Sequence, residues 1–303
     1  MMTQTPSTKI LVENRFPLEL KRSIVSIREL YETGKQQRWN PETDIAWAEF
    51  APQNYDAAAI DAGRLVWSRR AWLEYAGLAE TPAILIRLCL EAGRESDPKY
   101  FLTVRNTEEA WQIESAHRFA QLLGGYIDRP SSAQQKALFN QYRHRQALDA
   151  EQHADAFFTT HSAVEDGLEL ELHRAYLANA TDPVAYQLLE KGVQAKERHV
   201  TFGWLYVAER AANWSDADRA AIGAHAHKYL QETELSGYHC PWLAEPDGAE
   251  AIAAETAAKA GLGAATRATE QGIFVEYVAS VRERLGEFGV ALPPLTHSAL
   301  GQL

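Results

Sequence analysis

The stretch Gln194–Trp204, which reads Q-A-K-E-R-H-V-T-F-G-W, decides what fold we expect. Residues three and four positions apart share one face of a helix, so Lys196 lies on a face with apolar neighbours. Those neighbours are Leu189, Val193, Val200 and Gly203. A lysine is ordinarily a solvated surface residue, but this apolar stripe predicts that Lys196 points into a protein core. Glu197 lies among polar neighbours and is expected in solvent.

The whole chain has the composition of a globular protein. Its 303 residues are 46% hydrophobic and 23% charged, enough for a large core in one or two domains. The formal net charge is -11 and no basic run occurs, so nucleic acid is not an expected partner. Two cysteines exclude a disulfide framework, no apolar run is long enough for a membrane span, and no signal sequence is recognised. We therefore expect a cytoplasmic protein.

Residues 1 to about 60 are predicted to form an arm that docks on the rest of the protein. One short helix is expected around Leu18–Thr33. Prolines and polar residues break any helical period after it, which indicates an extended segment. Its aromatic residues are expected to anchor the arm, and they are Trp39, Trp47, Phe50 and Tyr55.

The first long helix is expected to begin near Asp61 and to meet Pro82. Because proline lacks a backbone donor and clashes with the preceding turn, a kink or break is expected beside Glu80. A carboxylate beside a disrupted turn in an apolar segment is a candidate site residue. The alternative is that Glu80 caps the second half of the helix together with Thr81.

A second helix is expected to open at Asn106, where Glu109 follows three residues later in a capping arrangement. Within this helix Glu114 and His117 are three residues apart, so their side chains share one face and can hold one ion. Glu-x-x-His also occurs by chance in many helices. The alternative is a surface glutamate with a partly buried histidine.

Helices are expected along the rest of the chain. A stretch from 130 to about 180 has an interruption near 147–151. The later helices are expected at 183–212, after a cap at Ser215, at 249–260 and at 266–288.

Glu165 lies in the second half of the 130–180 stretch on an apolar stripe. A carboxylate is costly to bury unless something pairs with it, so Glu165 is a candidate site residue. His161 and Glu169 flank it at four residues to either side. The alternative is a structural network of salt bridges, which can include Asp166 and His173.

The candidate residues follow one another in a repeated order. Glu80 precedes Glu114 by 34 residues, and Glu165 precedes His199 by 34. The order is a lone carboxylate, Glu-x-x-His, a second lone carboxylate and Lys-x-x-His. Two antiparallel helix pairs would bring all six residues together in one bundle core.

These segments resemble the ferritin-like di-iron carboxylate superfamily, and within it the oxidases and oxygenases. Those members are the small subunit of class I ribonucleotide reductase, acyl-carrier-protein desaturases and p-aminobenzoate N-oxygenase-like proteins. The segments are L-A-E-T-P-A-I-L, I-E-S-A-H-R-F-A-Q-L-L, S-A-V-E-D-G and K-E-R-H-V-T-F-G. The resemblance covers about 61–212. It implies an all-α fold with a ferritin-like four-helix bundle, to which the arm at 1–60 and a helical extension at 213–303 are added.

The resemblance also implies a metal centre and an activity. Its ligands, carried over position by position, are Glu80, Glu114, His117, Glu165 and His199, and the sixth ligand, a glutamate in the family, falls at Lys196. Carboxylates and imidazoles suit iron or manganese, with one or two ions per chain. The implied activity is the use of dioxygen to hydroxylate, N-oxygenate or desaturate a small organic substrate. The resemblance further implies a homodimer.

Lys196 changes the charge of this expected centre. Three carboxylates and a protonated Lys196 leave a net charge of minus two, which one divalent ion balances. Glu169 and Lys196 are the catalytic candidates: Glu169 can swing in as a substitute ligand, and a deprotonated Lys196 can act as an amine ligand or base. The alternatives are a metal-free binding or scaffold protein, in which Lys196 pairs with the carboxylates, and an unrelated helical protein.

Overall fold

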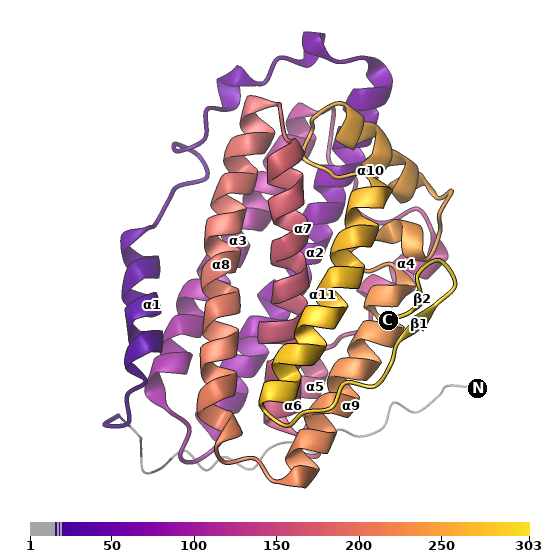
Figure 1. Cartoon of the computed structure of the whole chain (residues 1–303). Coiled ribbons are helices and arrows are strands. Elements are labelled where there is room, and N and C mark those ends of the chain that lie inside the picture. The colour runs from indigo at the N-terminus through magenta and orange to yellow at the C-terminus, as the bar shows by residue number, and fades with distance from the viewer. Residues whose placement is uncertain (1–15, 17, 19) are drawn as a thin grey trace, which may run out of the picture.

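The long helices of the chain lie side by side as a bundle (Figure 1). The computed structural model describes residues 16, 18 and 20–303. Its α-helices are α1 (Val25–Gln36), α2 (Ala57–Leu90), α3 (Ser96–Leu122), α4 (Ala133–Phe139), α5 (His144–Leu148), α6 (Ala154–Thr159), α7 (Asp166–Asn179), α8 (Pro183–Ala211), α9 (Asp216–Glu232), α10 (Ala249–Lys259) and α11 (Arg267–Glu287). The 3-10 turns are Trp47–Glu49, Pro52–Asn54, Glu234–Ser236 and Pro241–Leu243. A π-helical turn, Thr160–Glu165, joins α6 to α7, and β1 (Thr296–His297) pairs antiparallel with β2 (Gly301–Gln302).

Four long helices form the centre of the bundle. α2 packs on α3, α7 packs on α8, and α8 also contacts α3. Short connections, 91–95 and 180–182, join the members of each pair, as is usual between antiparallel neighbours. α10 packs on α2 and α11 packs on α7. The predicted all-α bundle with additional C-terminal helices is confirmed.

Local capping fixes where the later helices begin. The Asp182 side chain accepts hydrogen bonds from the backbone N–H groups of Val184 and Ala185, and Pro183 occupies the first helical position. Ser215 and Asp218 cap α9 reciprocally, which satisfies two N–H groups that have no partner within the helix. Both starts agree with the sequence-based expectation.

α2 differs from the expectation, because it runs through Pro82 without a break. It begins at Ala57, where the Asp56 carboxylate accepts a hydrogen bond from the N–H of Ala59. The residues on both sides of Pro82 are buried, and they include Thr81, Ala83 and Ile84. Packing on these neighbours therefore outweighs the loss of one backbone hydrogen bond.

α3 also differs, since it begins at Ser96 and Asn106 lies inside it. Pro98 is in the first turn, where its missing N–H has no partner within the helix to lose. The buried Asp97 carboxylate accepts hydrogen bonds from Ser23 Oγ and from the N–H of Ile24. The start of α3 is thus tied to the segment before α1, which no capping pattern around Asn106 reveals.

The N-terminal segment docks on the bundle, as predicted. α1 packs against α3 and α8. Trp39 is buried, and the ring of Phe50 meets Phe119 of α3 edge to face. The helix begins at Val25, later than expected. The part of the expected arm before residue 20, apart from residues 16 and 18, lies outside the described residues.

Apolar side chains gather in two clusters. One surrounds Phe101 and Phe202, and the other surrounds Trp67 and Phe119. Both clusters contain residues from the bundle and from the C-terminal helices, so the division of the chain at residues 60 and 212 stays a prediction. Among the described residues, no helix is long and apolar enough to cross a membrane.

Candidate metal centre

Lys196 points into the middle of the bundle, as the apolar stripe predicted. Its side chain is 4% exposed, and its Nζ lies 2.8 Å from Glu74 Oε1 of α2 and 2.8 Å from Glu169 Oε2 of α7. Burial alone would lower the pKa of Lys196, but these two carboxylates raise it above its usual value. The lysine is therefore a buried cation held between two helices. Glu197 is exposed, as expected.

The two carboxylates beside Lys196 differ in acidity. Burial raises the pKa of Glu74 to about 7, against the opposing charge of Lys196. For Glu169, burial is outweighed by Lys196, which lowers the pKa to about 2. Glu169 is thus ionised at neutral pH, whereas both the protonated and the ionised form of Glu74 are present there.

His173 completes this group and presents a free nitrogen to it. Its Nδ1 lies 2.9 Å from the carbonyl oxygen of Glu169, so Nδ1 carries the proton and donates it. Its buried Nε2 has no hydrogen-bond partner among the described residues and lies 4.0 Å from Glu74 Oε1. Burial and the charge of Lys196 hold the pKa of His173 well below its usual value, which keeps the ring neutral.

The expected ligands Glu80 and Glu165 lie together in a second buried group. Between them lies Arg143, whose Nε is 2.8 Å from Glu80 Oε1 and whose Nη2 is 2.9 Å from Glu165 Oε1. His161 contacts Glu165 and lies 3.6 Å from Glu80 Oε2. The charges of Arg143 and His161 overcome burial and lower the pKa of Glu165 well below its usual range. One guanidinium group therefore pairs with both carboxylates.

His199, another expected ligand, is engaged on a different side of α8. Its Nε2 lies 2.9 Å from Glu108 Oε2, and Arg198 holds the other oxygen of the same carboxylate. Although burial opposes it, His199 and Arg198 lower the pKa of Glu108. His199 is buried as predicted, but its imidazole pairs with a carboxylate of α3 outside the Lys196 group.

Glu114 and His117 are exposed, so their expected convergence with the other ligands is wrong. His117 faces the ring of Tyr126 and lies 3.5 Å from Gln121. The buried face of α3 instead carries Glu109 and Gln112, which are also three residues apart. Sequence spacing alone did not distinguish these two faces, since the predicted start at Asn106 assigned Glu109 to a cap.

Glu109 and Gln112 bring α3 to the edge of the Lys196 group. Glu109 accepts hydrogen bonds from Arg105 Nε and Thr81 Oγ1. Arg105 also pairs with Asp166 of α7 at 2.6 Å. A Cβ added at Gly192 would lie 3.3 Å from Gln112 Oε1 and 3.5 Å from the His173 ring, so both side chains line the same narrow space.

Sequence reasoning missed Glu74 and gave His173 no ligand role. The available signal was the Glu169–His173 spacing of four residues, which places the two side chains on one helical face. For Glu74 the signal was its distance of seven residues from both Trp67 and Thr81, two turns along a buried face. Both signals are as common in structural helices as the pairs that were selected.

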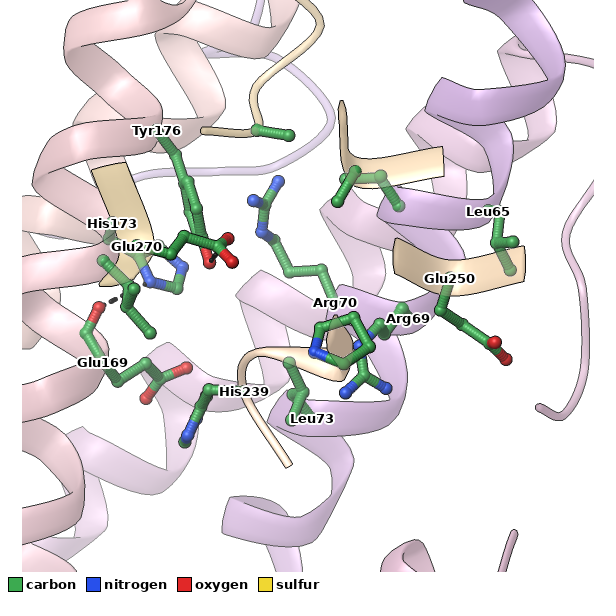
Figure 2. Close-up of a pocket in the computed structure, with 15 residues that line it drawn as sticks. Leu65, Arg69, Arg70, Leu73, Glu169, His173, Tyr176, His239, Glu250 and Glu270 are labelled. Carbon is green, nitrogen blue, oxygen red and sulfur yellow. Dashed lines mark hydrogen bonds between the residues drawn. The ribbon is translucent and has the colours of Figure 1, made fainter. Parts of the chain in front are cut away.

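A cavity opens directly beside the group (Figure 2). Glu169 and His173 form one wall, and Arg69 and Arg70 of α2 form another. The apolar part of the lining includes Leu65, Val66, Leu73, Leu172 and Pro241. A small molecule in this cavity would contact Glu169 and His173, two of the three residues of the group formed with Glu74.

Comparisons with known proteins were made at the levels of sequence and structure. No family model and no curated protein matches the chain. Solved R2-like ligand-binding oxidases do match its structure. One with an aerobically reconstituted Mn/Fe cofactor has a TM-score of 0.65 and 18% identity, over 86% of this chain and 92% of that chain. Another, after photoconversion of its metal cofactor, has a TM-score of 0.67 and 15% identity, over 85% and 92%.

The chain has the ferritin-like fold. The resemblance stated from the sequence is therefore confirmed for the architecture, and an identity below one fifth carries no further than that. Within the described residues, three groups bring carboxylate and imidazole atoms within 4.8 Å of one another. They are Glu74, Glu169 and His173; Glu80, His161 and Glu165; and Glu165, Glu234 and His239.

The first of these groups fits a metal ion best in this ferritin-like bundle. Its imidazole has a nitrogen without a hydrogen-bond partner, whereas in the second group the Nδ1 atom of His161 contacts Glu165. In the third group, His239 Nδ1 is paired with Glu234 at 2.8 Å. One imidazole and two carboxylates suit iron or manganese. The residues present therefore fit one such ion at Glu74, Glu169 and His173, beside the ammonium group of Lys196.

Proposed function

We propose that this chain is a metal-dependent oxidase that binds one iron or manganese ion at Glu74, Glu169 and His173. The observation that carries the proposal is the buried, unpartnered Nε2 of His173, which faces two carboxylates from two helices. The structural neighbours with a ferritin-like fold are oxidases with Mn/Fe cofactors, which supports the class of activity. We infer that the substrate is a small organic molecule that is hydroxylated, N-oxygenated or desaturated with dioxygen.

Counting the buried charges favours one ion over two. The carboxylates at the centre of the bundle are Glu74, Glu109, Asp166 and Glu169, and the cations paired with them are Lys196 and Arg105. With all of them ionised the sum is minus two, which one divalent ion balances. A second ion would leave two uncompensated positive charges in a low-dielectric core, at several kcal/mol per ion.

The residues of this chain would prepare the site in four ways. Lys196 keeps Glu169 ionised, and a neutral His173 has a lone pair for the metal. Glu74, with its pKa of about 7, is able to hold or release a proton near neutral pH. The apolar cavity wall excludes bulk water. When bound, the ion supplies the electron-transfer chemistry that dioxygen requires.

Metal content tests this proposal directly. Protein purified without chelator should contain about one iron or manganese ion per chain by elemental analysis. His173→Ala should lose most of that metal while its helical circular-dichroism spectrum persists, because the site keeps only two carboxylates. His117→Ala is the matched control, since this exposed imidazole of α3 lies away from the group and its loss should leave the metal content unchanged.

The competing function is that of a metal-free binding protein. One observation favours it: Lys196 already pairs with both carboxylates. Absence of bound metal after purification, together with no binding of Fe²⁺ or Mn²⁺ in titrations, would establish this alternative and refute the oxidase. Loss of metal in His117→Ala but not in His173→Ala would instead refute the ligand set.

A further inference from the structure

Two adjacent arginines of α2 are buried in the wall of the cavity. Arg69 and Arg70 are each 6% exposed. Among the described residues, neither makes an ion pair with a carboxylate, whereas Arg105 and Arg143 in the same bundle each pair with two. Burying a cation without a counter-charge is expensive. Two such cations side by side call for an explanation.

Backbone carbonyl groups satisfy only part of each guanidinium. Arg69 Nη2 donates to the carbonyl oxygens of Gly237 and Tyr238, and Arg70 Nη2 donates to that of Gly263. Three of their buried nitrogens have no hydrogen-bond partner among the described residues: Arg69 Nε, Arg69 Nη1 and Arg70 Nη1. These carbonyls hold both side chains in position, and some guanidinium N–H donors remain without an acceptor.

The carboxylates that line the cavity are engaged elsewhere. Glu270 accepts hydrogen bonds from Tyr176 Oη at 3.1 Å and Trp242 Nε1 at 2.8 Å. Glu169 pairs with Lys196. Glu250 lies 3.5 Å from Ser131 Oγ, and in Figure 2 its side chain points away from Arg69. The spare donors of the arginines therefore have no competing carboxylate within ion-pair distance.

The arginines lie close to the candidate metal centre. Arg70 and Glu74 are four residues apart on α2, so about 6 Å, slightly more than one helical turn, separates them along the axis. Glu169 and His173 line the same cavity as both arginines (Figure 2). A molecule held at the guanidinium groups thus reaches the metal ligands if it is only a few bonds long.

We propose that the cavity binds a short organic acid, with its carboxylate at Arg69 and Arg70 and its other end against Glu169 and His173. Guanidinium groups match a carboxylate in charge and donate several hydrogen bonds to it. The apolar residues Leu65, Leu73 and Leu172 would contact its hydrocarbon part. The role of this acid as a substrate rests on the proposed oxidase function. The binding of the acid does not depend on that function.

The size of the cavity favours a small acid. Its volume is about 50 Å³, compared with about 150 Å³ for an engineered cavity that accepts benzene. Acetate, which is smaller than benzene, is therefore a suitable probe, and acetamide is its neutral counterpart of nearly the same shape. Calorimetric titration of the full chain at neutral pH measures both.

Acetate should bind wild-type protein at least tenfold more tightly than acetamide does, since only the acid brings a charge. Arg70→Met keeps most of the length of the side chain without its charge, and it should weaken acetate binding about tenfold or more. Arg69→Met should do the same independently, which protects the test if one variant fails to fold. Arg174→Met, at an exposed arginine of α7, is the matched control and should bind as wild type does.

Each other outcome overturns the inference. The inference is wrong if wild-type protein binds no acetate, if acetamide binds equally well, or if the folded variants bind acetate like wild type. Metal analysis of the same samples separates the two proposals. Acetate binding in protein that takes up no metal would support the acid site and refute the oxidase, whereas metal without acetate binding would refute the acid site alone.

Discussion

The ammonium group of Lys196 contacts one carboxylate from α2 and one from α7, where the family pattern has a further glutamate ligand. Its single positive charge would take the place of one of the two positive charges that a second divalent ion would bring. The lysine also sets the ionisation of its neighbours, because Glu169 becomes strongly acidic while the more weakly compensated Glu74 titrates near neutrality. We propose that this one residue sets both the number of ions and the acid–base chemistry of the site.

Lys196→Glu should raise the metal stoichiometry from about one ion per chain toward two, because it removes a positive charge and adds a ligand. Without metal, the variant should melt at a lower temperature than wild type, since three buried carboxylates then repel one another. Titration with Mn²⁺ and thermal unfolding measure the two effects.

The control for this variant is Lys191→Glu, which makes the same charge change one and a half turns away at a partly exposed position of α8. Its stoichiometry should equal that of wild type. Two tight sites in the wild-type protein would show that the charge argument is wrong.

Glu270 predicts a pH dependence of stability. Burial raises its pKa from 4.5 to about 7. The folded state therefore binds more protons than the unfolded state between these values, and stability falls as the pH rises from about 4.5 to 7. Glu270→Gln stays neutral and can bond both Tyr176 and Trp242. It should gain roughly 3 kcal/mol relative to wild type between pH 4 and pH 8, as measured by denaturant unfolding.

The exposed Glu276 on the same helix provides the comparison for this experiment. In Glu276→Gln the pH dependence of wild type should persist. If the free energy of unfolding of Glu270→Gln changed with pH in parallel with that of wild type, the raised pKa of Glu270 would be contradicted.

At the scale of elements, the π-helical turn Thr160–Glu165 and α8 approach each other very closely. A Cβ added at Gly203 would lie 1.6 Å from the carbonyl oxygen of Ser162 and 3.0 Å from the N–H nitrogen of Ala163. Backbone atoms cannot move aside as the end of a side chain does. Only glycine permits α8 to pack at this depth, which holds Lys196 opposite Glu169.

Gly203→Ala should destabilise the protein by about 3 kcal/mol or more, because α8 must move away from the π-helical turn. Gly272→Ala is the matched control: this exposed glycine of α11 has no neighbour within 4 Å of an added Cβ. It should gain roughly 0.5–1 kcal/mol from the higher helix propensity of alanine. Equal unfolding midpoints for the two variants would disprove the close approach.

At the scale of the molecule, the homodimer implied by the family resemblance stays a prediction. α2 carries two large apolar side chains at its surface: Tyr75 is 65% exposed and Ile86 is 47% exposed. They are eleven residues apart, which is about three turns, so they share one face. We expect this face to pair with that of a second chain.

Light scattering should give twice the mass of one chain for wild-type protein. Tyr75→Lys with Ile86→Lys should give the mass of a single chain with its helical content retained. Tyr186, an exposed aromatic residue of α8, supplies the control substitution Tyr186→Lys, which should leave the dimer intact. A wild-type protein that is monomeric over a wide concentration range would refute the prediction.

The sequence by itself determined the architecture and the inward position of Lys196. Helix starts depend on local residues, so Pro183 and Ser215 revealed the starts of α8 and α9. The apolar period around Lys196 likewise depends only on residues within two turns. These inferences succeeded because each interaction lies within one helix.

Only the tertiary structure decided which carboxylates meet. Glu74 and Glu80 both lie on buried parts of α2, and Glu165 and Glu169 are one turn apart, so periodicity does not choose between them. The π-helical turn shifts the helical register just before α7. Arg143, which precedes α5, pairs with Glu80 and Glu165. Both effects arise from packing between segments distant in sequence, and the free energy of a buried charge depends on the partner that packing supplies.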